Sequence, residues 1–600
     1  MEHMKNTGIN CLLVVWILAA MPLQAQTALP AELAAAYREM PGELVYVHQN
    51  TGLLFSGETL YYKLYCLGRS TGKPSSISKI AYVAIVNRER EVVFRQKLRL
   101  QDGTGQGDFL LPADIPTGSY KLLAYTQWMK NGNGAPVFSS DLMLINPYQE
   151  VPQDYLPENR ADSITADSLA IQPAKILQPA IPSIPSGTEA FTATLNREGY
   201  GRRQKVELEL LSPNADAPGG RYSISVRRVP KLKPPPPSDP LAFEEVARKT
   251  EVTGAEKEEI FLPELRGELI SGKVQTASGS QPVANIPLAL SLSGDDFIFD
   301  MARTDGQGRF YFNIDLDYEA SSGIFQVLGN VKEEEYDLLL DPHSVPVPGP
   351  LEFYDFRLDP MLAAEISDRS IRNQIENAYG EVKADTLVKV AQEIPFYRNF
   401  QQQIRLDDFT RFNTIMETLV EVVDHVWLDR DPRGDPMFQV RPFDGYLDGI
   451  GLPPMVFMDG LFMQNHEDIV SFPARRIKNI FISRDRYQLG ANVFQGILAF
   501  ETFGSDFADS FYRNFLKPET LFKPVPAKTY FYQEYNGSDE KTRIPDFRQQ
   551  LYWNPGLEIV EAKTNIHWYT SDLPGTYEIR IQGYTATGHP VALHKTFIVE

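Results

Sequence analysis

Residues 43–66 read ELVYVHQNTGLLFSGETLYYKLYC, and this stretch decides the fold. It contains two apolar runs rich in aromatic residues, at 45–47 and 60–65, with Gly52 and Gly57 between them. Short apolar runs bounded by glycine are typical of β-strands that meet at a turn. The stretch therefore predicts two strands around a turn.

The strand pattern continues on the C-terminal side of this stretch. Similar apolar runs follow at residues 80–86, 92–100, 118–128 and 137–145. Strands at such short intervals, with no helical pattern between them, predict an antiparallel β-sandwich, which we assign to residues 40–148. Residues 149–188 are rich in Pro, Ser and Asp, which predicts a linker.

Three later segments repeat the strand pattern. They are residues 189–232, 263–345 and 520–600. Between the first two, residues 233–262 combine a run of prolines with a charged stretch of helical character. A polyproline run is a stiff spacer, so we expect a second linker there.

Residues 358–427 change character. Phe412, Ile415, Leu419 and Val422 recur every three or four positions, which predicts a helix with one apolar face. Strand patterns return at residues 428–510. The chain is therefore predicted to be mainly β, with serial β-sandwich domains, a small α+β domain and a helical segment.

Composition limits the classes of function. The chain has 600 residues, with 58 Lys+Arg against 78 Asp+Glu and a formal net charge of −20. This balance argues against a nucleic-acid partner, because a phosphate backbone is bound by Lys and Arg. Two cysteines exclude a disulfide framework and any Cys-rich zinc module. At about 150 residues per domain, the length predicts roughly four domains.

The N-terminus has the order of a secretory signal peptide. Lys5 precedes a short apolar run at 11–21, and Ala25 stands before the expected cleavage point, so residues 1–25 would be removed. The alternative is an uncleaved anchor, although the run is shorter than the roughly 20 residues of a membrane span. No later stretch is a candidate span. Cys66 would then be the remaining cysteine, in a strand pattern that predicts a buried, inert thiol.

Several motifs in residues 43–147 are specific. They are Val45-Tyr46-Val47-His48, Phe55-x-Gly57-Glu58-Thr59, Pro116-x-Gly118-x-Tyr120 and Ala124-Tyr125-Thr126-x-Trp128-Met129. With them this segment resembles the second macroglobulin-type (MG2) domain of the α2-macroglobulin superfamily. Asn50-Thr51-Gly52 departs from that family, which tends to have Asp, a basic residue and Pro there. Residues 189–232 look like a second, weaker macroglobulin-like, Ig-like β segment.

Two further resemblances follow along the chain. Thr304-Asp305-x-x-Gly308-x-Phe310 and its neighbours make residues 263–345 similar to the carboxypeptidase regulatory-like β-sandwich, a structural appendage. Pro454-x-Val456-Phe457-x-Asp459-Gly460 makes residues 428–510 resemble the plug domain of TonB-dependent outer-membrane receptors. The arrangement as a whole resembles exported Bacteroidetes-type multidomain proteins, and residues 520–600 would end it as a C-terminal β-sandwich.

No catalytic or metal-binding constellation emerges from the sequence. The chain lacks the Gly-Cys-Gly-Glu-Gln run of a thioester, and none of its 8 histidines forms a zinc-peptidase motif. His48 lies in a strand pattern that predicts a hydrogen-bonded structural role, and the His466-Glu467 pair is expected to be solvated. Asp429-x-Asp431-x-x-x-Asp435 favours a charged turn, with Ca²⁺ binding as the alternative. We therefore predict no cofactor.

The segment that resembles a plug domain, residues 428–510, is expected to have no transport barrel of its own. A TonB-type receptor needs roughly 22 strands of about 10 residues each. Only about 90 residues follow position 510 in the 600-residue sequence, so we expect no transport barrel. The turn and returning strand at Asp459, Gly460, Leu461 and Phe462 are therefore predicted to contact a partner.

Together these features predict an exported, non-enzymatic interaction protein of the cell envelope, in the periplasm or associated with the outer membrane. Its expected partners are envelope or outer-membrane proteins. One alternative is a hydrolase with an unrecognised site in residues 358–427. Another is a non-covalent protease inhibitor, as the macroglobulin resemblance implies.

Overall fold

The structure of the chain is a computed structural model. It describes residues 40–133, 137–156, 191–212, 218–250, 253–254, 260–276, 283–329, 336–349, 351–388, 392–443, 451–535, 543–559 and 561–600. The signal peptide predicted at residues 1–25 and most of the linker predicted at 149–188 lie outside these residues.

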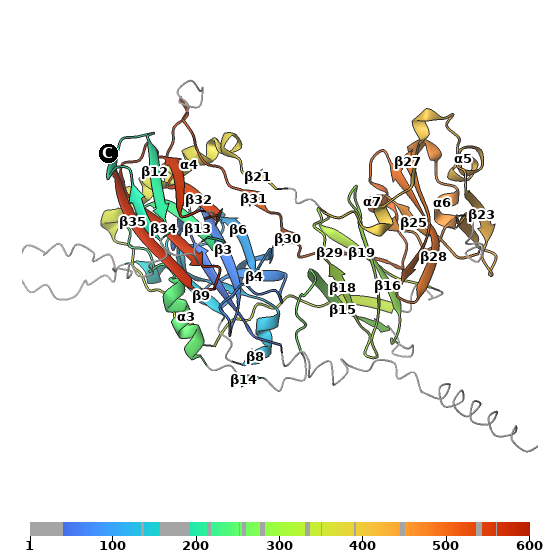
Figure 1. Ribbon diagram of the computed structural model, residues 1–600, viewed down its shortest axis with the longest axis horizontal. Helices are drawn as coiled ribbons and strands as arrows, with labels where there is room; N and C mark the ends of the chain where they lie inside the picture. The colour runs from blue at the N-terminus through green and yellow to red at the C-terminus, as the bar shows by residue number, and fades with distance from the viewer. Residues whose placement is uncertain are drawn as a thin grey trace, which may run out of the picture. The chain divides into compact units, whose positions relative to one another are not determined.

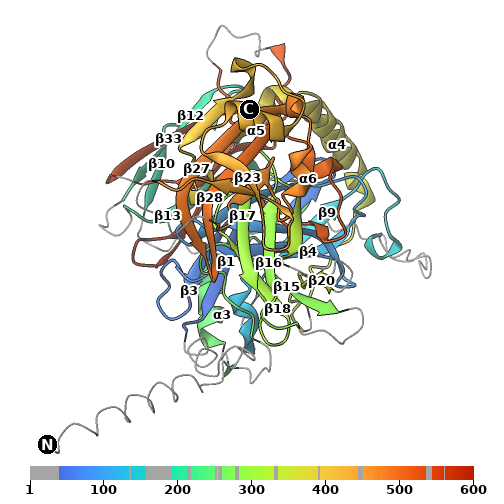
Figure 2. The same cartoon turned by 90° about the vertical axis from the view of Figure 1, so that its right-hand side faces the viewer.

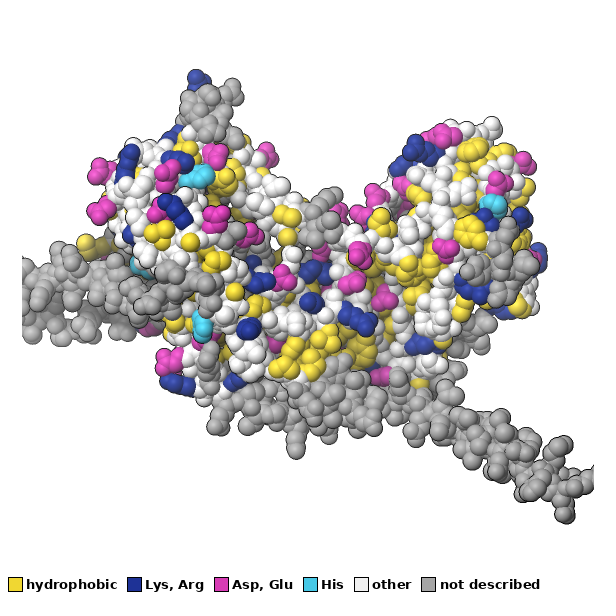
Figure 3. Space-filling model, in the orientation of Figure 1, with side chains coloured by type: hydrophobic (Ala, Val, Ile, Leu, Met, Phe, Trp, Pro, Cys, Tyr) yellow, Lys and Arg dark blue, Asp and Glu magenta, His cyan; other side chains and the backbone are white. Residues whose placement is uncertain are grey.

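The chain forms two compact units, each assembled from segments far apart in the sequence (Figure 1). Unit 1 contains Leu269–Pro342 and Gln392–Phe522, and unit 2 contains Met40–Glu268, His343–Ala391 and Lys523–Glu600. The described residues form ten sheets, so the predicted mainly β fold of serial β-sandwiches is confirmed. Basic and acidic side chains are intermingled on the face shown in Figure 3.

The first sandwich of unit 2 holds the strands predicted from residues 43–145. One sheet has the order β1 (Glu43–Gln49), β3 (Thr59–Gly68), β6 (Thr104–Leu110). The other has the order β2 (Leu53–Phe55), β9 (Phe138–Ile145), β7 (Gly118–Tyr125), β4 (Ile80–Val86), β5 (Val92–Arg99), β30 (Pro524–Val525). The edge strand β30 comes from the C-terminal part of the chain, which no local pattern indicated.

Strand β1 is buried on both faces, because a second sandwich covers the first. All seven of its residues are buried. Tyr46 donates a hydrogen bond to Gln582 Oε1 at 2.7 Å, and His48 Nδ1 lies 2.6 Å from Ser223 Oγ. The structural role predicted for His48 is thus confirmed. Cys66, on the paired strand β3, is a buried free thiol, as predicted, and burial raises its pKa.

The second sandwich of unit 2 combines two segments that the sequence presented as separate. One sheet has the order β10 (Thr192–Leu195), β12 (Lys205–Leu211), β33 (Lys563–Tyr569). The other has the order β11 (Gly199–Tyr200), β35 (Pro590–Val599), β34 (Gly575–Tyr584), β13 (Arg221–Arg228), β32 (Gln550–Leu557). Val206 pairs with Trp568 across this junction, and both are in one hydrophobic core. The strands of residues 192–228 and 550–599 therefore build one sandwich, since neither group supplies enough strands alone. The two domains predicted separately at 189–232 and 520–600 thus share one core.

Helices and two small sheets complete unit 2. The helices are α3 (Pro240–Lys249) and α4 (Ala363–Ala378). The small sheets pair β8 (Gly132–Asn133) with β14 (Thr253–Gly254), and β21 (Thr386–Leu387) with β31 (Lys528–Thr529). The charged stretch in the linker predicted at 233–262 thus contains α3, which Asp239 caps by accepting from the backbone N–H groups of Leu241 and Ala242.

Unit 1 contains a smaller sandwich built around residues 268–340. One sheet has the order β18 (Arg309–Ile314), β15 (Glu268–Thr276), β20 (Tyr336–Leu340). The other has the order β17 (Ile298–Arg303), β16 (Pro287–Leu292), β19 (Ser322–Val327), β29 (Leu516–Thr520). Strand β29 follows the plug-like segment in sequence and returns to complete this sheet.

The other part of unit 1 is a sheet flanked by short helices (Figure 2). Its order is β22 (Gln402–Arg405), β27 (Ile477–Leu489), β28 (Asn492–Thr502), β25 (Met455–Met458), β26 (Leu461–Phe462). Around it lie α5 (Ile415–Val422), α6 (Glu467–Val470), α7 (Phe507–Ser510) and the hairpin of β23 (Val426–Arg430) and β24 (Pro436–Val440). Ile415 and Leu419 of α5 are in the core, as the helical spacing predicted.

The helical segment predicted at residues 358–427 does not form one body. Helix α4 belongs to unit 2, whereas β22 and α5 belong to unit 1. Strand β22 forms because its residues pair with β27, a tertiary contact that local propensity does not reveal. Among the described residues, we find no helix that is both long and apolar enough to cross a membrane.

Candidate binding cleft

The hairpin predicted to contact a partner is buried in unit 1. Asp459 accepts hydrogen bonds from the backbone N–H of Thr502 at 2.7 Å, from its hydroxyl at 2.6 Å and from the backbone N–H of Phe507 at 3.1 Å. Gly460 has φ +81°, and a Cβ there would lie 2.3 Å from Cβ of Phe297. Asp459 is therefore fixed by hydrogen bonds within its own unit, and Phe297 leaves no room beside Gly460.

The returning strand of this hairpin is equally enclosed. Leu461 is in the core beside the sheet, and the ring of Phe462 stacks on that of Phe299 at 4.9 Å. The four residues of the hairpin therefore offer little surface to a partner in this structure. Their role as a contact surface remains a prediction.

Two other sequence interpretations can be compared with the structure. His466 is buried, which contradicts the predicted solvated loop: its Nδ1 accepts from the backbone N–H of Phe438 at 3.0 Å, and burial lowers its pKa to about 4. Asp431 accepts from the backbone N–H groups of Arg433 and Asp435, both at 2.9 Å. This geometry is that of the charged turn favoured by the sequence.

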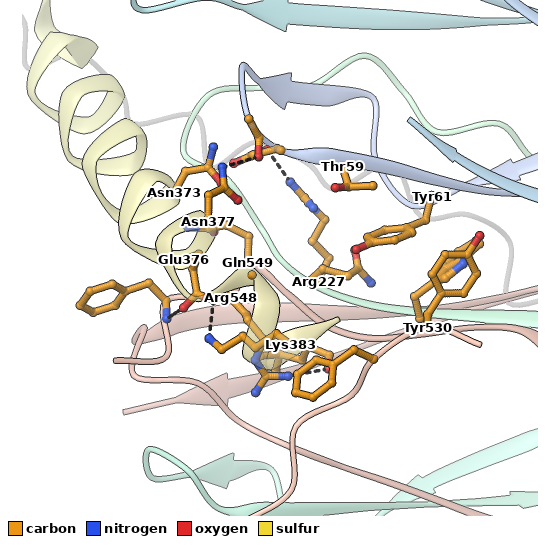
Figure 4. Close-up of a pocket in the computed structure, with 18 of the residues that line it drawn as sticks. Thr59, Tyr61, Arg227, Asn373, Glu376, Asn377, Lys383, Tyr530, Arg548 and Gln549 are labelled. Carbon is orange, nitrogen blue, oxygen red and sulfur yellow. Dashed lines mark hydrogen bonds and ion pairs between the residues drawn. The ribbon is translucent and has the colours of Figure 1, made fainter. Parts of the chain in front are cut away.

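The candidate site is a cavity of ≈ 360 Å³ within unit 2 (Figure 4). Five stretches of chain supply its walls: the β2–β3 turn with the start of β3, strand β13, helix α4 with the residues after it, the residues that follow β31, and the region around β32. The charged residues that line it are Glu58, Arg227, Arg369, Glu376, Lys383, Asp385 and Arg548. The volume is at the small end of the range for ligand pockets.

Glu58 is placed by a tight turn against helix α4. Gly57 has φ +84°, a conformation that favours glycine, and a Cβ there would lie 2.8 Å from the side-chain nitrogens of Asn373 and Asn377. Asn373 donates to Ser56 O and Asn377 to Gly57 O, both at 2.9 Å. Because the two asparagines are four residues apart, they share the face of α4 that meets the turn.

Two arginines converge on the Glu58 carboxylate. Arg369, four residues before Asn373 on the same helix, donates from Nε to Oε1 at 2.8 Å and from Nη2 to Oε2 at 2.7 Å. Arg227 on β13 donates to Oε2 at 3.0 Å. Burial alone would raise the pKa of Glu58, but the charges of Arg369 and Arg227 outweigh burial and the pKa lies below its usual value. Glu58 is therefore a buried, ionised carboxylate.

The other charged groups of the cleft are held in separate contacts. Lys383 donates to Glu376 at 2.5 Å, and Glu376 also accepts from the backbone N–H of Phe547. Arg548 forms a two-pronged pair with Asp546, with both distances 2.7 Å. Asp385 accepts from the backbone N–H of Phe531, and burial raises its pKa.

Aromatic rings form much of the remaining wall. The rings of Tyr61 and Tyr530 meet edge to face at 5.1 Å, and the rings of Tyr61 and Trp553 are stacked at 6.1 Å. Burial raises the pKa of Tyr61, so its hydroxyl stays protonated at neutral pH. The described residues that line the cleft include no serine, cysteine or histidine. The arrangement is thus suited to holding a ligand by charge and stacking.

The sequence contained part of this site. The motif Phe55-x-Gly57-Glu58-Thr59 was noted, but Glu58 was assigned no partner because Arg369 is 311 residues away. The polar positions Arg369, Asn373 and Asn377 do recur at helical spacing, and this stripe was the available signal.

Comparisons with known proteins give no family. No family model matches the chain, and no curated protein matches it. Among solved structures, Escherichia coli alpha-2-macroglobulin activated by porcine elastase is similar. The alignment covers 93% of the present chain and 44% of the macroglobulin chain, at 9% identity and a TM-score of 0.21. Salmonella alpha-2-macroglobulin reacted with methylamine aligns with 93% and 40%, at 9% identity and a TM-score of 0.22.

A shorter protein also matches. The sporulation control protein Spo0M of Bacillus subtilis aligns with 29% of this chain and 69% of its own, at 12% identity and a TM-score of 0.12. The chain spans less than half the length of the macroglobulins named above. With TM-scores this low, the fold rests on the sheets described above, and these similarities carry no argument about function.

Proposed function

We propose that this chain is an exported, non-enzymatic binding protein of the cell envelope, associated with the outer membrane, and that the cleft of unit 2 is its ligand site. The observation that carries the proposal is the Glu58 cluster. Its carboxylate is held by Arg369 and Arg227 at 2.7 to 3.0 Å, so it serves to fix two guanidinium groups in place. A carboxylate paired in this way is not free to take up or release a proton, as general acid–base catalysis requires.

The modular make-up supports the same reading. The signal-peptide order of residues 1–25 points to export, and the resemblances to MG2, carboxypeptidase regulatory-like and plug domains are to binding or structural modules. Serial β-sandwiches are rigid scaffolds that commonly present binding sites.

Affinity capture from an outer-membrane extract tests the proposal. The purified chain, an Arg227→Met variant and a matched Arg228→Met variant would each be used as bait. Arg228 is the next residue on β13, and its Nε donates to Pro574 O at 3.0 Å. We expect the intact chain and Arg228→Met to enrich the same envelope protein, with Arg227→Met enriching less.

Three outcomes would count against the proposal. Capture of no envelope protein by the intact chain would remove its support. Hydrolysis of a general ester or peptide substrate by the chain, lost in a Glu376→Gln variant, would favour an enzyme. Slower cleavage of large substrates by trypsin in the presence of the chain would favour the protease-inhibitor alternative.

A further inference from the structure

Positive charge exceeds negative charge at the buried end of the cleft. Two guanidinium groups share the single carboxylate of Glu58, and all three side chains are no more than 7% exposed. Of the other charges of the cleft, Lys383 is matched by Glu376 and Arg548 by Asp546. The carboxyl of Asp385 accepts from the backbone N–H of Phe531, and burial raises its pKa. An unmatched buried charge is costly, so this end favours a bound anion.

Hydrogen-bond donors also exceed acceptors here. The hydrogen bond to Glu58 is the only one that the Arg227 guanidinium makes within the described chain, although a guanidinium carries several N–H groups. Arg227 lines the cleft, so its remaining N–H groups can be satisfied by a ligand that carries acceptor oxygens.

The aromatic wall of the cleft indicates what kind of group is attached to the acceptor oxygens of the ligand. Tyr61, Tyr530 and Trp553 present ring faces and edges, which suit an aromatic or apolar group. A cavity of ≈ 360 Å³ has room for a group about the size of one amino-acid side chain. A single excess charge fits a carboxylate better than a dianionic phosphate, because Glu376 and Asp385 also line the cleft.

We propose that the cleft binds a carboxylate attached to an aromatic or apolar group, with Arg227 as the principal partner of the carboxylate and the aromatic wall as the partner of the attached group. This inference deepens the proposed binding function and rests on it. Two sources carry this chemistry: a free small acid, and the C-terminal residue of a polypeptide.

Calorimetric titration of the purified chain tests the inference with defined probes. N-acetylphenylalanine represents the free acid, and a hexapeptide ending in phenylalanine represents the polypeptide C-terminus. The matched controls are the C-terminal amides of both, which keep the ring and lose the charge. Inorganic phosphate is the competing anion.

We expect one or both acids to bind and their amides to bind roughly 10- to 100-fold more weakly, because hydrogen bonds to a charged group are lost. Arg227→Met should weaken the binding of the acids by a similar factor. Arg228→Met should bind as the intact chain does. Arg227→Met leaves Glu58 paired with Arg369, so we expect it to fold, and urea unfolding would verify this.

Each arm has a defined meaning. If only the hexapeptide binds, the ligand is a polypeptide C-terminus. If both acids bind equally, the cleft recognises only the carboxylate and the ring, and the rest of a polypeptide adds nothing. Equal binding of acids and amides, unchanged binding by Arg227→Met, or binding of phosphate in preference to both acids would overturn the inference. Envelope capture could still succeed in those cases, which would leave the proposed function standing without this ligand class.

Discussion

Glu58→Gln is the sharpest test of how unit 2 is held together. The substitution keeps the shape of the side chain and removes the charge that Arg369 and Arg227 share. Three hydrogen bonds from guanidinium groups, at 2.7, 2.8 and 3.0 Å, would lose their ionised acceptor. Two like charges would then face each other in a site where the Glu58 side chain is 6% exposed.

Removing one partner of a buried ion pair costs about 3–5 kcal/mol. We therefore expect Glu58→Gln to lower the free energy of unfolding by about that amount, a large share of the roughly 5–15 kcal/mol typical of a domain. Urea unfolding followed by tryptophan fluorescence would measure the change, with an unchanged slope indicating an unchanged unfolding reaction.

The control is Glu365→Gln, on the same unit. Glu365 pairs with Lys231 at 2.9 Å, but the lysine side chain is 68% exposed. Such a surface pair contributes about 0–1 kcal/mol, so its loss should be small. If Glu58→Gln cost no more than Glu365→Gln, the Glu58 cluster would not stabilise the fold and the reasoning behind the cleft would be refuted.

Three further predictions follow from the same geometry. Gly57→Ala should destabilise unit 2 by about 1–3 kcal/mol, because φ is +84° there, and faster hydrogen exchange in α4 would show it. Lowering the pH from 6.5 toward 4 should destabilise unit 1. In this range His466 takes up a proton in the unfolded chain, whereas its pKa near 4 keeps it neutral in the folded chain. A His466→Gln variant should therefore unfold with a flatter pH dependence. Asp459→Ala should lower the free energy of unfolding by about 1–3 kcal/mol, measured by urea unfolding, because it leaves buried N–H groups unpaired. Unchanged stability with weaker partner capture would instead support the hairpin as a contact surface.

Local sequence patterns were sufficient to predict a strand and its neighbour where the two strands are close together in the chain. The apolar runs around Val45–Val47 and at 60–65 became β1 and β3, which pair with each other in register from Glu43 with Gly68 to Gln49 with Tyr62. The turn between them needs Gly57 at positive φ, as the motif indicated. These features depend on contacts between residues close in the chain, which periodicity and turn chemistry record.

Long-range pairing was beyond the same reasoning. The strand pattern of residues 189–232 predicted strands there, but nothing in it indicated that residues 563–569 would pair with residues 205–211. The prediction for His466 was wrong for a related reason. The His466-Glu467 pair was expected to be solvated, and only tertiary packing against Phe438 buries the histidine. The Glu58 cluster joins residues 169 and 311 positions away, so each member looked like an ordinary surface charge.

The cleft exists only when those distant segments meet, and this links ligand binding to folding. Helix α4 supplies Arg369 and the asparagines that hold the β2–β3 turn, while β13 supplies Arg227 from the second sandwich. A ligand that binds only the assembled cleft stabilises the folded state by RT ln(1 + [L]/Kd), about 2.7 kcal/mol at a hundred times Kd. A carboxylate ligand should therefore raise the urea midpoint of the intact chain more than that of Arg227→Met, for which 10- to 100-fold weaker binding leaves about 0.4–1.4 kcal/mol at the same ligand concentration. Because it compares one protein with and without ligand, this shift separates a binding role for Arg227 from a purely structural one.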